Sequence, residues 1–180
     1  MDSLRGQLLI SSGGLFDPNF RHTVVLVGEH NRDGALGVVL NRALDVDVAD
    51  AVPELASWVA QGEPLFQGGP VQPESPVMVA EFHDPAAADL HIFDSIGFLI
   101  GDIADAVRQE VVRARVYAGY SGWGPGQLEA EMAADSWIVD PALSEDVFTD
   151  NPDLLWSRVL RRKGPEYRRL STMPFDPSMN

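Results

Sequence analysis

Two nearly uninterrupted apolar runs constrain the fold of this chain more than any other feature. TVVLVGEH, residues 23–30, and ALGVVLNR, residues 35–42, are joined by a short connection that ends in Gly34. Runs rich in β-branched residues with such a connection are typical of an antiparallel β-hairpin. Because neither arm alternates apolar with polar residues, we expect other elements to cover both faces of the hairpin.

The rest of the chain predicts further strands interleaved with short helices. Strand-like runs are expected at 6–12, 76–82, 91–102, 114–120 and 136–142. Helices are expected at 103–111, at 127–135 and from Pro152 to Gly164, and residues 48–59 predict either one helix from Pro53 or two turns around it. Residues 62–76, with three glycines and four prolines, predict a long connection.

These segments show no regular βαβ rhythm, so the predicted fold class is α+β. We expect a single compact domain over residues 1–180, with a mixed, largely antiparallel β-sheet and short flanking helices. A C-terminal helix and tail are expected at about 151–180.

The charge balance argues against direct binding of nucleic acid. The chain carries 27 acidic and 13 basic residues, for a formal net charge of -14. Nucleic acids bind mainly to basic surfaces, from which counterions are released. Six of the basic residues lie in residues 151–180, so a local basic patch at the C-terminus stays open.

Neither a secreted nor a metal-dependent protein is indicated. Cysteine is absent, and the first residues lack the basic start and apolar run of a secretory signal. No apolar stretch approaches the roughly 18 residues of a membrane span, so we expect a cytoplasmic protein with no membrane contact. The spacing of His83, Asp84 and His91 is not a metal-ligand pattern, and we expect no metal and no cofactor.

The stretch GYSGWGPGQLEAE, residues 119–131, is the main candidate functional segment. Ser121 could be a nucleophile at a strand-to-helix elbow, although Trp123 stands where the G-x-S-x-G motif needs its second glycine. Alternatively, the backbone amides and the start of the following helix could cradle a small anion, although the pattern matches no common nucleotide-binding loop.

Two further alternatives concern the aromatic residues of this stretch. Tyr120 and Trp123 could anchor a protein or peptide partner from a mobile glycine-rich loop. In the structural alternative, Trp123 instead folds back into the core while the glycines adopt positive backbone angles. The sequence leaves all of these alternatives open.

Two other segments are expected to line one groove with residues 120–127, namely the turn DPNF at 17–20 and GGPV at 68–71. Arg42 is included because an arginine at the end of a strand could grip a carboxylate or a phosphate. The candidate ligand- or partner-binding residues are therefore Tyr120, Ser121, Gly122, Trp123, Gly124, Gly126, Gln127, Asp17, Asn19, Arg42, Gly68 and Gly69. No catalytic residue is assigned.

Taken together, three blocks of the sequence resemble the YqgE/AlgH family of bacterial proteins. They span residues 6–42, 68–71 and 119–131 in the family's order. The resemblance implies a single-domain α+β fold and brings no established reaction, cofactor or catalytic residue, although the family is often labelled a transcriptional regulator. We therefore expect a non-enzymatic domain that binds an unidentified small molecule or protein partner, with an indirect regulatory role. An enzyme that acts on a small anionic metabolite at the glycine-rich loop is the alternative.

Overall fold

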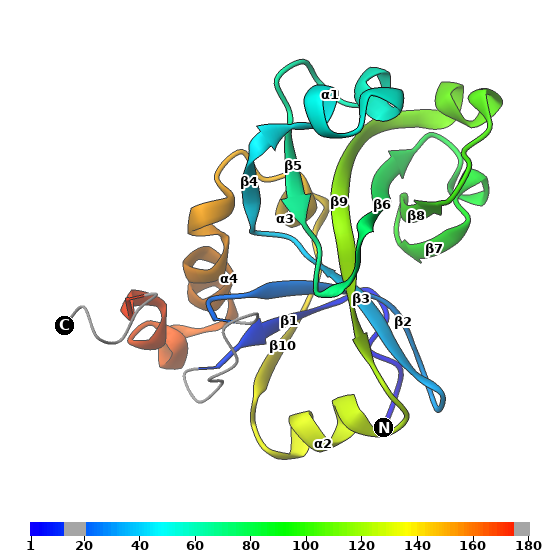
Figure 1. The fold of residues 1–180 in the computed structure, drawn as a ribbon. Helices are drawn as coiled ribbons and strands as arrows, with labels where there is room; N and C mark the ends of the chain where they lie inside the picture. Colours follow the sequence, from blue (N-terminus) through cyan, green and yellow to red (C-terminus); the bar gives the residue numbers. More distant parts are fainter. Residues whose placement is uncertain (13–20, 175–180) are drawn as a thin grey trace.

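The computed structural model describes residues 1–12 and 21–174, and its strands form one mostly antiparallel sheet with short helices around it (Figure 1). The strands are β1 (Gln7–Ser11), β2 (Val24–Asn31), β3 (Gly34–Val39), β4 (Ala43–Asp47), β5 (Pro64–Gln67), β6 (Val71–Phe82), β7 (Leu90–Phe93), β8 (Ile96–Ile100), β9 (Val111–Trp123) and β10 (Trp137–Pro141). The α-helices are α1 (Val48–Ala51), α2 (Gln127–Ala133), α3 (Ser144–Val147) and α4 (Leu155–Lys163). The 3₁₀ helices are η1 (Pro53–Trp58), η2 (Pro85–Ala87), η3 (Asp105–Glu110), η4 (Pro152–Leu154), η5 (Pro165–Tyr167) and η6 (Leu170–Thr172). The single-domain α+β fold class is confirmed.

The long strand β9 joins the two halves of this sheet. The strand order is β10-β1-β2-β3-β9-β6-β8-β7, and β4 pairs with β5, which itself pairs with β9. The first part of β9 is antiparallel to β6 and parallel to β5, whereas Ser121 to Trp123 pair with β3. Figure 1 shows β9 running from the β4–β8 half into the half that contains β1, β2, β3 and β10.

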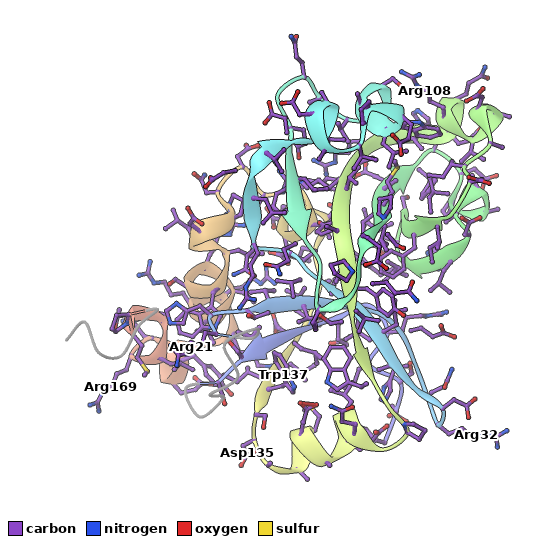
Figure 2. The ribbon with its side chains drawn as sticks, in the orientation of Figure 1. Arg21, Arg32, Arg108, Asp135, Trp137 and Arg169 are labelled. Carbon is purple, nitrogen blue, oxygen red and sulfur yellow. The ribbon has the colours of Figure 1, made fainter. Side chains whose placement is uncertain are left out.

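The predicted hairpin is confirmed as β2 and β3, and both of its faces are covered. Val24 and Leu26 belong to one apolar cluster, to which α4 contributes Leu155 and Val159. The alternating residues of β2 face a second cluster, which includes Leu128 of α2 and Trp137, labelled in Figure 2. Because both faces are buried, the strand needs no polar alternation.

Three predictions from the sequence give the wrong bounds or the wrong type for an element. The strand predicted at 114–120 covers 111–123, because its end pairs with β3, so residues 120–123 are not a loop. The helix predicted at 103–111 is only the 3₁₀ helix η3, since Val111 is already paired with Phe82 of β6. The connection predicted at 62–76 contains β5 and the first residues of β6, where pairing with β4 and β9 outweighs the prolines.

Two helix predictions are confirmed in outline. Residues 48–59 form two separate turns, α1 and η1, which meet before Pro53. The last helix follows the Pro152 turn and ends at Gly164, with its apolar residues buried and Arg158, Arg161 and Arg162 exposed. Among the described residues, no helix is both long enough and apolar enough to cross a membrane.

Candidate functional site

The glycine-rich motif and the GGPV segment do meet, but they meet where the connection between β5 and β6 packs against the end of β9. Val71 pairs with Tyr120, and the Gly68 amide donates to the Ala118 carbonyl at 2.9 Å. A Cβ atom on Gly69 would lie 2.2 Å from the Tyr120 carbonyl carbon, so this position admits only glycine. We call residues 68–71 and 119–123 the glycine junction; its glycines permit backbone to pack on backbone.

The serine and the tryptophan of the motif lie in the interior. Ser121 is fully buried, and its hydroxyl donates to the Gly68 carbonyl at 3.2 Å. Trp123 is 5% exposed and packs edge-on against Trp137, with ring centroids 6.3 Å apart. Trp123 is therefore a core residue, as the structural alternative expects. Ser121 lies in the middle of paired strands, a position that offers no support for a nucleophile elbow.

The exposed part of the motif is a local turn into α2. The Gly124 amide donates to the Oε1 atom of Gln127 at 3.0 Å, and Gly126 has a φ of 75° before the helix begins. Gly122 is exposed at the end of β9. The side chain of Gln127 thus already occupies one of the amides that the anion alternative would use.

The remaining predicted site residues that the structure describes, Arg42 and Tyr120, do not line one groove. Arg42 donates from Nη2 to Thr23 Oγ1 at 3.1 Å and to the Arg21 carbonyl at 3.3 Å, away from the glycine-rich turn. Tyr120 is half-buried and lines a separate apolar hollow. Asp17 and Asn19 lie outside the described residues.

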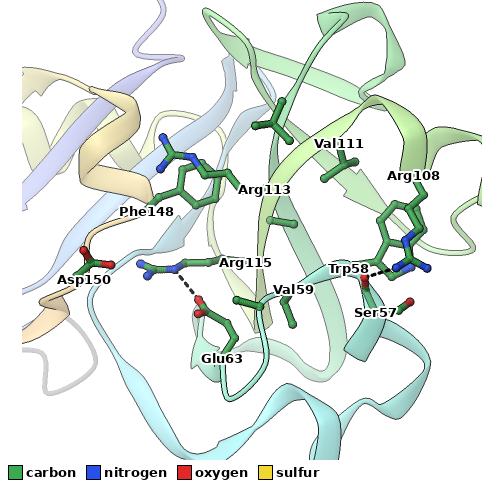
Figure 3. Close-up of a pocket in the computed structure, with 13 residues that line it drawn as sticks. Ser57, Trp58, Val59, Glu63, Arg108, Val111, Arg113, Arg115, Phe148 and Asp150 are labelled. Carbon is green, nitrogen blue, oxygen red and sulfur yellow. Dashed lines mark hydrogen bonds and ion pairs between the residues drawn. The ribbon is translucent and has the colours of Figure 1, made fainter.

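A different hollow, on the first half of β9, combines arginines with aromatic rings (Figure 3). It has a volume of about 500 Å³ and lies between η1, the end of η3, β9 and the residues that follow α3. We call it the arginine groove; its lining residues are Ser57, Trp58, Val59, Ala60, Glu63, Arg108, Val111, Val112, Arg113, Ala114, Arg115, Phe148 and Asp150.

The alternation of β9 places two arginines on the groove side. Ala114 and Val116 face an apolar cluster, so Arg113 and Arg115 project from the opposite face of the strand. Arg108 comes from η3, just before the strand. Figure 3 shows Arg108 beside Trp58 at one end of the groove, and the two β9 arginines toward Phe148 and Asp150 at the other.

Each of the three arginines lies on an aromatic ring. The guanidinium carbon of Arg113 is 4.3 Å from the ring centroid of Phe148, and that of Arg115 is 4.9 Å from Phe66. The third pair, Arg108 over Trp58, is looser at 6.0 Å. A guanidinium stacked on a ring keeps its edge free for the oxygens of a carboxylate or phosphate.

Ion pairs fix the two β9 arginines in place. Arg115 is buried, and it donates to Glu63 at 2.8 Å and to the Val147 carbonyl at 3.2 Å. Arg113 donates from Nε to Glu81 Oε2 at 3.0 Å, and its Nη2 lies 3.0 Å from the same oxygen in an ion pair. Its Nη1 has no hydrogen-bond partner among residues 1–12 and 21–174. Within the described part of the chain, Arg108 makes one hydrogen bond, from Nη2 to the Ser57 carbonyl at 2.6 Å, besides its contact with the Trp58 ring. The groove therefore offers positioned donors that the described protein groups do not use.

Tyr117 lies on the same face of β9 as Arg113 and Arg115, but in the core. It is fully buried, and its hydroxyl has no hydrogen-bond partner within the described part of the chain. Burial raises the pKa of this phenol, an effect that the nearby charge of Arg115 opposes and that of Glu63 reinforces. The phenol is therefore a neutral group behind the groove at physiological pH.

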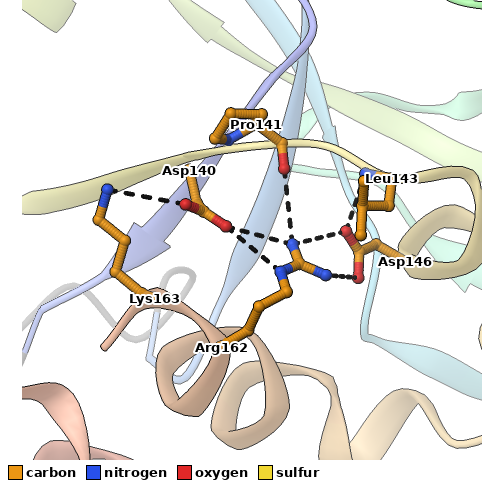
Figure 4. A network of polar contacts seen from close by, with 6 residues as sticks. All are labelled: Asp140, Pro141, Leu143, Asp146, Arg162 and Lys163. Atoms are coloured by element: carbon orange, nitrogen blue, oxygen red, sulfur yellow. Dashed lines mark hydrogen bonds and ion pairs between the residues drawn. The ribbon is translucent and has the colours of Figure 1, made fainter. Parts of the chain in front are cut away.

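A second hollow of about 420 Å³ continues the arginine groove toward α4 and shares Arg113, Phe148 and Asp150 with it. Here Arg162 makes two 2.9 Å hydrogen bonds to the fully buried Asp146 and two 3.3 Å hydrogen bonds to Asp140 (Figure 4). This clamp holds α4 against β10 and α3. Arg162 is thus a structural residue at the rim.

The sequence predictions missed the groove, although a signal for it was present. The run VRARV places charged residues at alternate positions of a strand, which is costly unless each has a partner or a function. Nothing in the sequence indicates that η1 and Phe148 approach this strand. Across 1–12 and 21–174, no three His, Cys, Asp or Glu residues are grouped as a metal site requires.

Comparisons with known proteins place the chain in a family. The AlgH-like family model, DUF179, matches residues 8–168. A UPF0301 protein of Streptomyces avermitilis is 38% identical to this chain, and the match covers 100% of this chain and 97% of the relative. A UPF0301 protein of Chlorobium limicola is also 38% identical, and that match covers 99% of this chain and 97% of the relative.

Two solved structures share the fold. The crystal structure of protein DIP2367 from Corynebacterium diphtheriae matches with a TM-score of 0.84 at 28% identity, covering 96% of this chain and 93% of that one. The solution structure of AlgH from Pseudomonas aeruginosa matches with a TM-score of 0.73 at 26% identity, covering 96% and 95%. The chain belongs to the AlgH-like, UPF0301 family of uncharacterised proteins.

Proposed function

We propose that this chain is a non-enzymatic binding domain that holds an organic anion in the arginine groove. The observation that carries the proposal is that three arginines, Arg108, Arg113 and Arg115, line one hollow, and that the rings beneath Arg108 and Arg113 line it as well. Arg113 and Arg115 are both stacked and ion-paired, so they are held in place before a ligand arrives and little entropy is lost on binding. Val59 and Val111 supply apolar contact for the body of the ligand.

The ligand class follows from the free donors. Nη1 of Arg113 and the Nε and Nη1 atoms of Arg108 suit the oxygens of a carboxylate or a phosphate. The two arginines lie at opposite ends of the groove (Figure 3), so a ligand with one anionic group presents that group to one arginine and its apolar or aromatic body to the other end. A regulatory role of this protein would then depend on ligand binding rather than on direct contact with DNA, in keeping with the net charge of -14.

Calorimetric titration with phenyl phosphate, inorganic phosphate and phenol tests this proposal. We expect phenyl phosphate to bind most tightly, and Arg113→Gln to weaken it by roughly ten- to a hundredfold, the effect of one charged hydrogen bond. Arg32→Gln is the matched control, since Arg32 lies at the tip of the β2–β3 hairpin, far from Arg108 (Figure 2). Equal binding by both variants, or no binding of phenyl phosphate at all, would contradict the proposal.

A further inference from the structure

An apolar hollow on the other side of η1 has a rim of acidic residues. It has a volume of about 750 Å³ and lies between η1, the start of β6 and the segment from Ile100 to Asp105. Six of its apolar side chains are contributed by four elements, β3, η1, β8 and β9, and by the segment after β8. They are Leu36, Leu55, Trp58, Ile100, Ile103 and Tyr120.

Part of the apolar lining is open to solvent. Ile100 is 49% exposed at the end of β8, and Tyr120 is half-buried and lines the hollow. Apolar surface that has a rim of polar residues is typical of protein-interaction sites. Tyr120 adds an amphipathic ring of the kind enriched at protein interfaces.

The rim carries one sign of charge. Glu54, Asp102 and Asp105 are exposed, and none of them has an ion pair among the residues that the structure describes. No arginine or lysine lines this hollow, in contrast to the arginine groove. Apolar surface inside a ring of unpaired carboxylates is complementary to a segment that has apolar side chains on one face and cations on the other.

We propose that this hollow, the acidic-rimmed groove, docks a short cationic amphipathic segment of a partner protein. The apolar face of the segment covers Ile100, Ile103 and Tyr120, and its lysines or arginines pair with the three rim carboxylates, as in helix-in-groove recognition. Helix α4 of a second copy of this chain is not that segment, because its apolar face is already buried. This inference does not depend on the anion site, although Trp58 lines both hollows.

Fluorescence anisotropy with a short labelled leucine–lysine amphipathic peptide tests the proposal, with a leucine–glutamate peptide as its counterpart. The test variant is Glu54→Gln/Asp102→Asn/Asp105→Asn. The control variant, Asp2→Asn/Asp135→Asn/Asp153→Asn, removes the same charge from exposed positions outside the groove. Neither variant removes an ion pair found among the described residues, so both should fold.

We expect the leucine–lysine peptide to bind the wild type and the control within about twofold, and the rim variant at least about tenfold more weakly. Equal weakening by both variants would mean that only the bulk negative charge attracts the peptide, and would overturn the proposal. Failure of the peptide to bind the wild type would overturn it as well.

The location of the peptide gives a second, independent readout. With labelled isoleucine methyl groups, binding should shift the NMR signals of Ile100 and Ile103, which line the groove, and leave Ile10 in the opposite half-sheet unchanged. Shifts confined to other isoleucines would place the peptide elsewhere and contradict the assignment.

Discussion

The two ends of β9 carry the glycine junction and the arginine groove, and they differ in what their residues do. One end packs the backbone tightly, and the other presents side chains at the surface. At the junction, Gly69 and Gly119 let backbone contact backbone, and Ser121 is buried between β3 and the Gly68 carbonyl. At the groove, Arg113 stands on the strand surface with donors that no described protein group uses. A distinctive sequence motif can therefore mark where a chain must pack closely, while the binding chemistry lies several residues away on the same strand.

The largest expected effect would come from adding a side chain at the junction. In Gly69→Ala, the new Cβ atom would overlap the Tyr120 carbonyl, so we expect a loss of about 4 kcal/mol in the free energy of unfolding, or failure to fold. Gly122→Ala is the control, because its Cβ would meet only side-chain atoms, at 3.6 Å and 3.7 Å, and should cost less than about 0.5 kcal/mol. Urea unfolding measures both, and equal stability of the two variants would break the comparison.

A smaller loss in the free energy of unfolding is expected at the ion pairs of Arg162, at the rim of the arginine groove. Asp146→Asn leaves Arg162 with Asp140 alone, and we expect it to cost about 3 kcal/mol, because one charge of a buried pair is removed. Asp140→Asn, at the more exposed carboxylate, should cost less than half of that. Thermal unfolding followed by circular dichroism compares them, and the reverse order would mean that the clamp is held chiefly by Asp140.

Replacing Ser121 tests whether the glycine-rich motif has a structural or a catalytic role. Ser121→Ala removes one hydroxyl donor from the Gly68 carbonyl, which still accepts the Val39 amide at 2.8 Å, so we expect a loss of only about 1 kcal/mol. Phenyl phosphate binding should be unchanged. A fluorophosphonate probe should leave the wild-type protein unlabelled, and labelling that disappears in Ser121→Ala would contradict this account.

The smallest effect concerns the contact that fixes α2 near the junction. Because His30 Nδ1 accepts the Leu4 amide at 2.9 Å, its Nε2 carries the proton and donates to Glu129 at 2.7 Å. This hydrogen bond lowers the pKa of the Glu129 carboxyl. The stabilisation is therefore present above the carboxyl's unfolded-state pKa and is lost as the pH falls through the lower folded-state value.

The stability difference between wild type and Glu129→Gln, measured by urea unfolding over a pH series, should be largest near neutral pH and vanish in acid. Glu29→Gln, at an exposed carboxylate with no ion pair among the described residues, is the control. A difference that grows in acid would show that the contact is not an ionic hydrogen bond.

The hairpin and the last helix could be predicted because their signals are local. Unbroken apolar runs and the stops at Pro152 and Gly164 act within a few residues. The strand character of residues 120–123 could not be predicted, since it comes from pairing with β3, distant in sequence. The arginine groove was missed for the same reason, because Phe148 and η1 reach Arg113 and Arg108 only in the folded chain.

Two tryptophans report on the two ends of β9 and allow the most direct test. Trp58 lines the arginine groove, whereas Trp123 is buried at the junction. In an NMR titration with phenyl phosphate, the account predicts that the indole N–H signal of Trp58 and the Nε–H signals of Arg108 and Arg113 shift together, while that of Trp123 stays in place. If the indole N–H signal of Trp123 shifts and that of Trp58 does not, the ligand binds at the glycine junction, which would contradict the account.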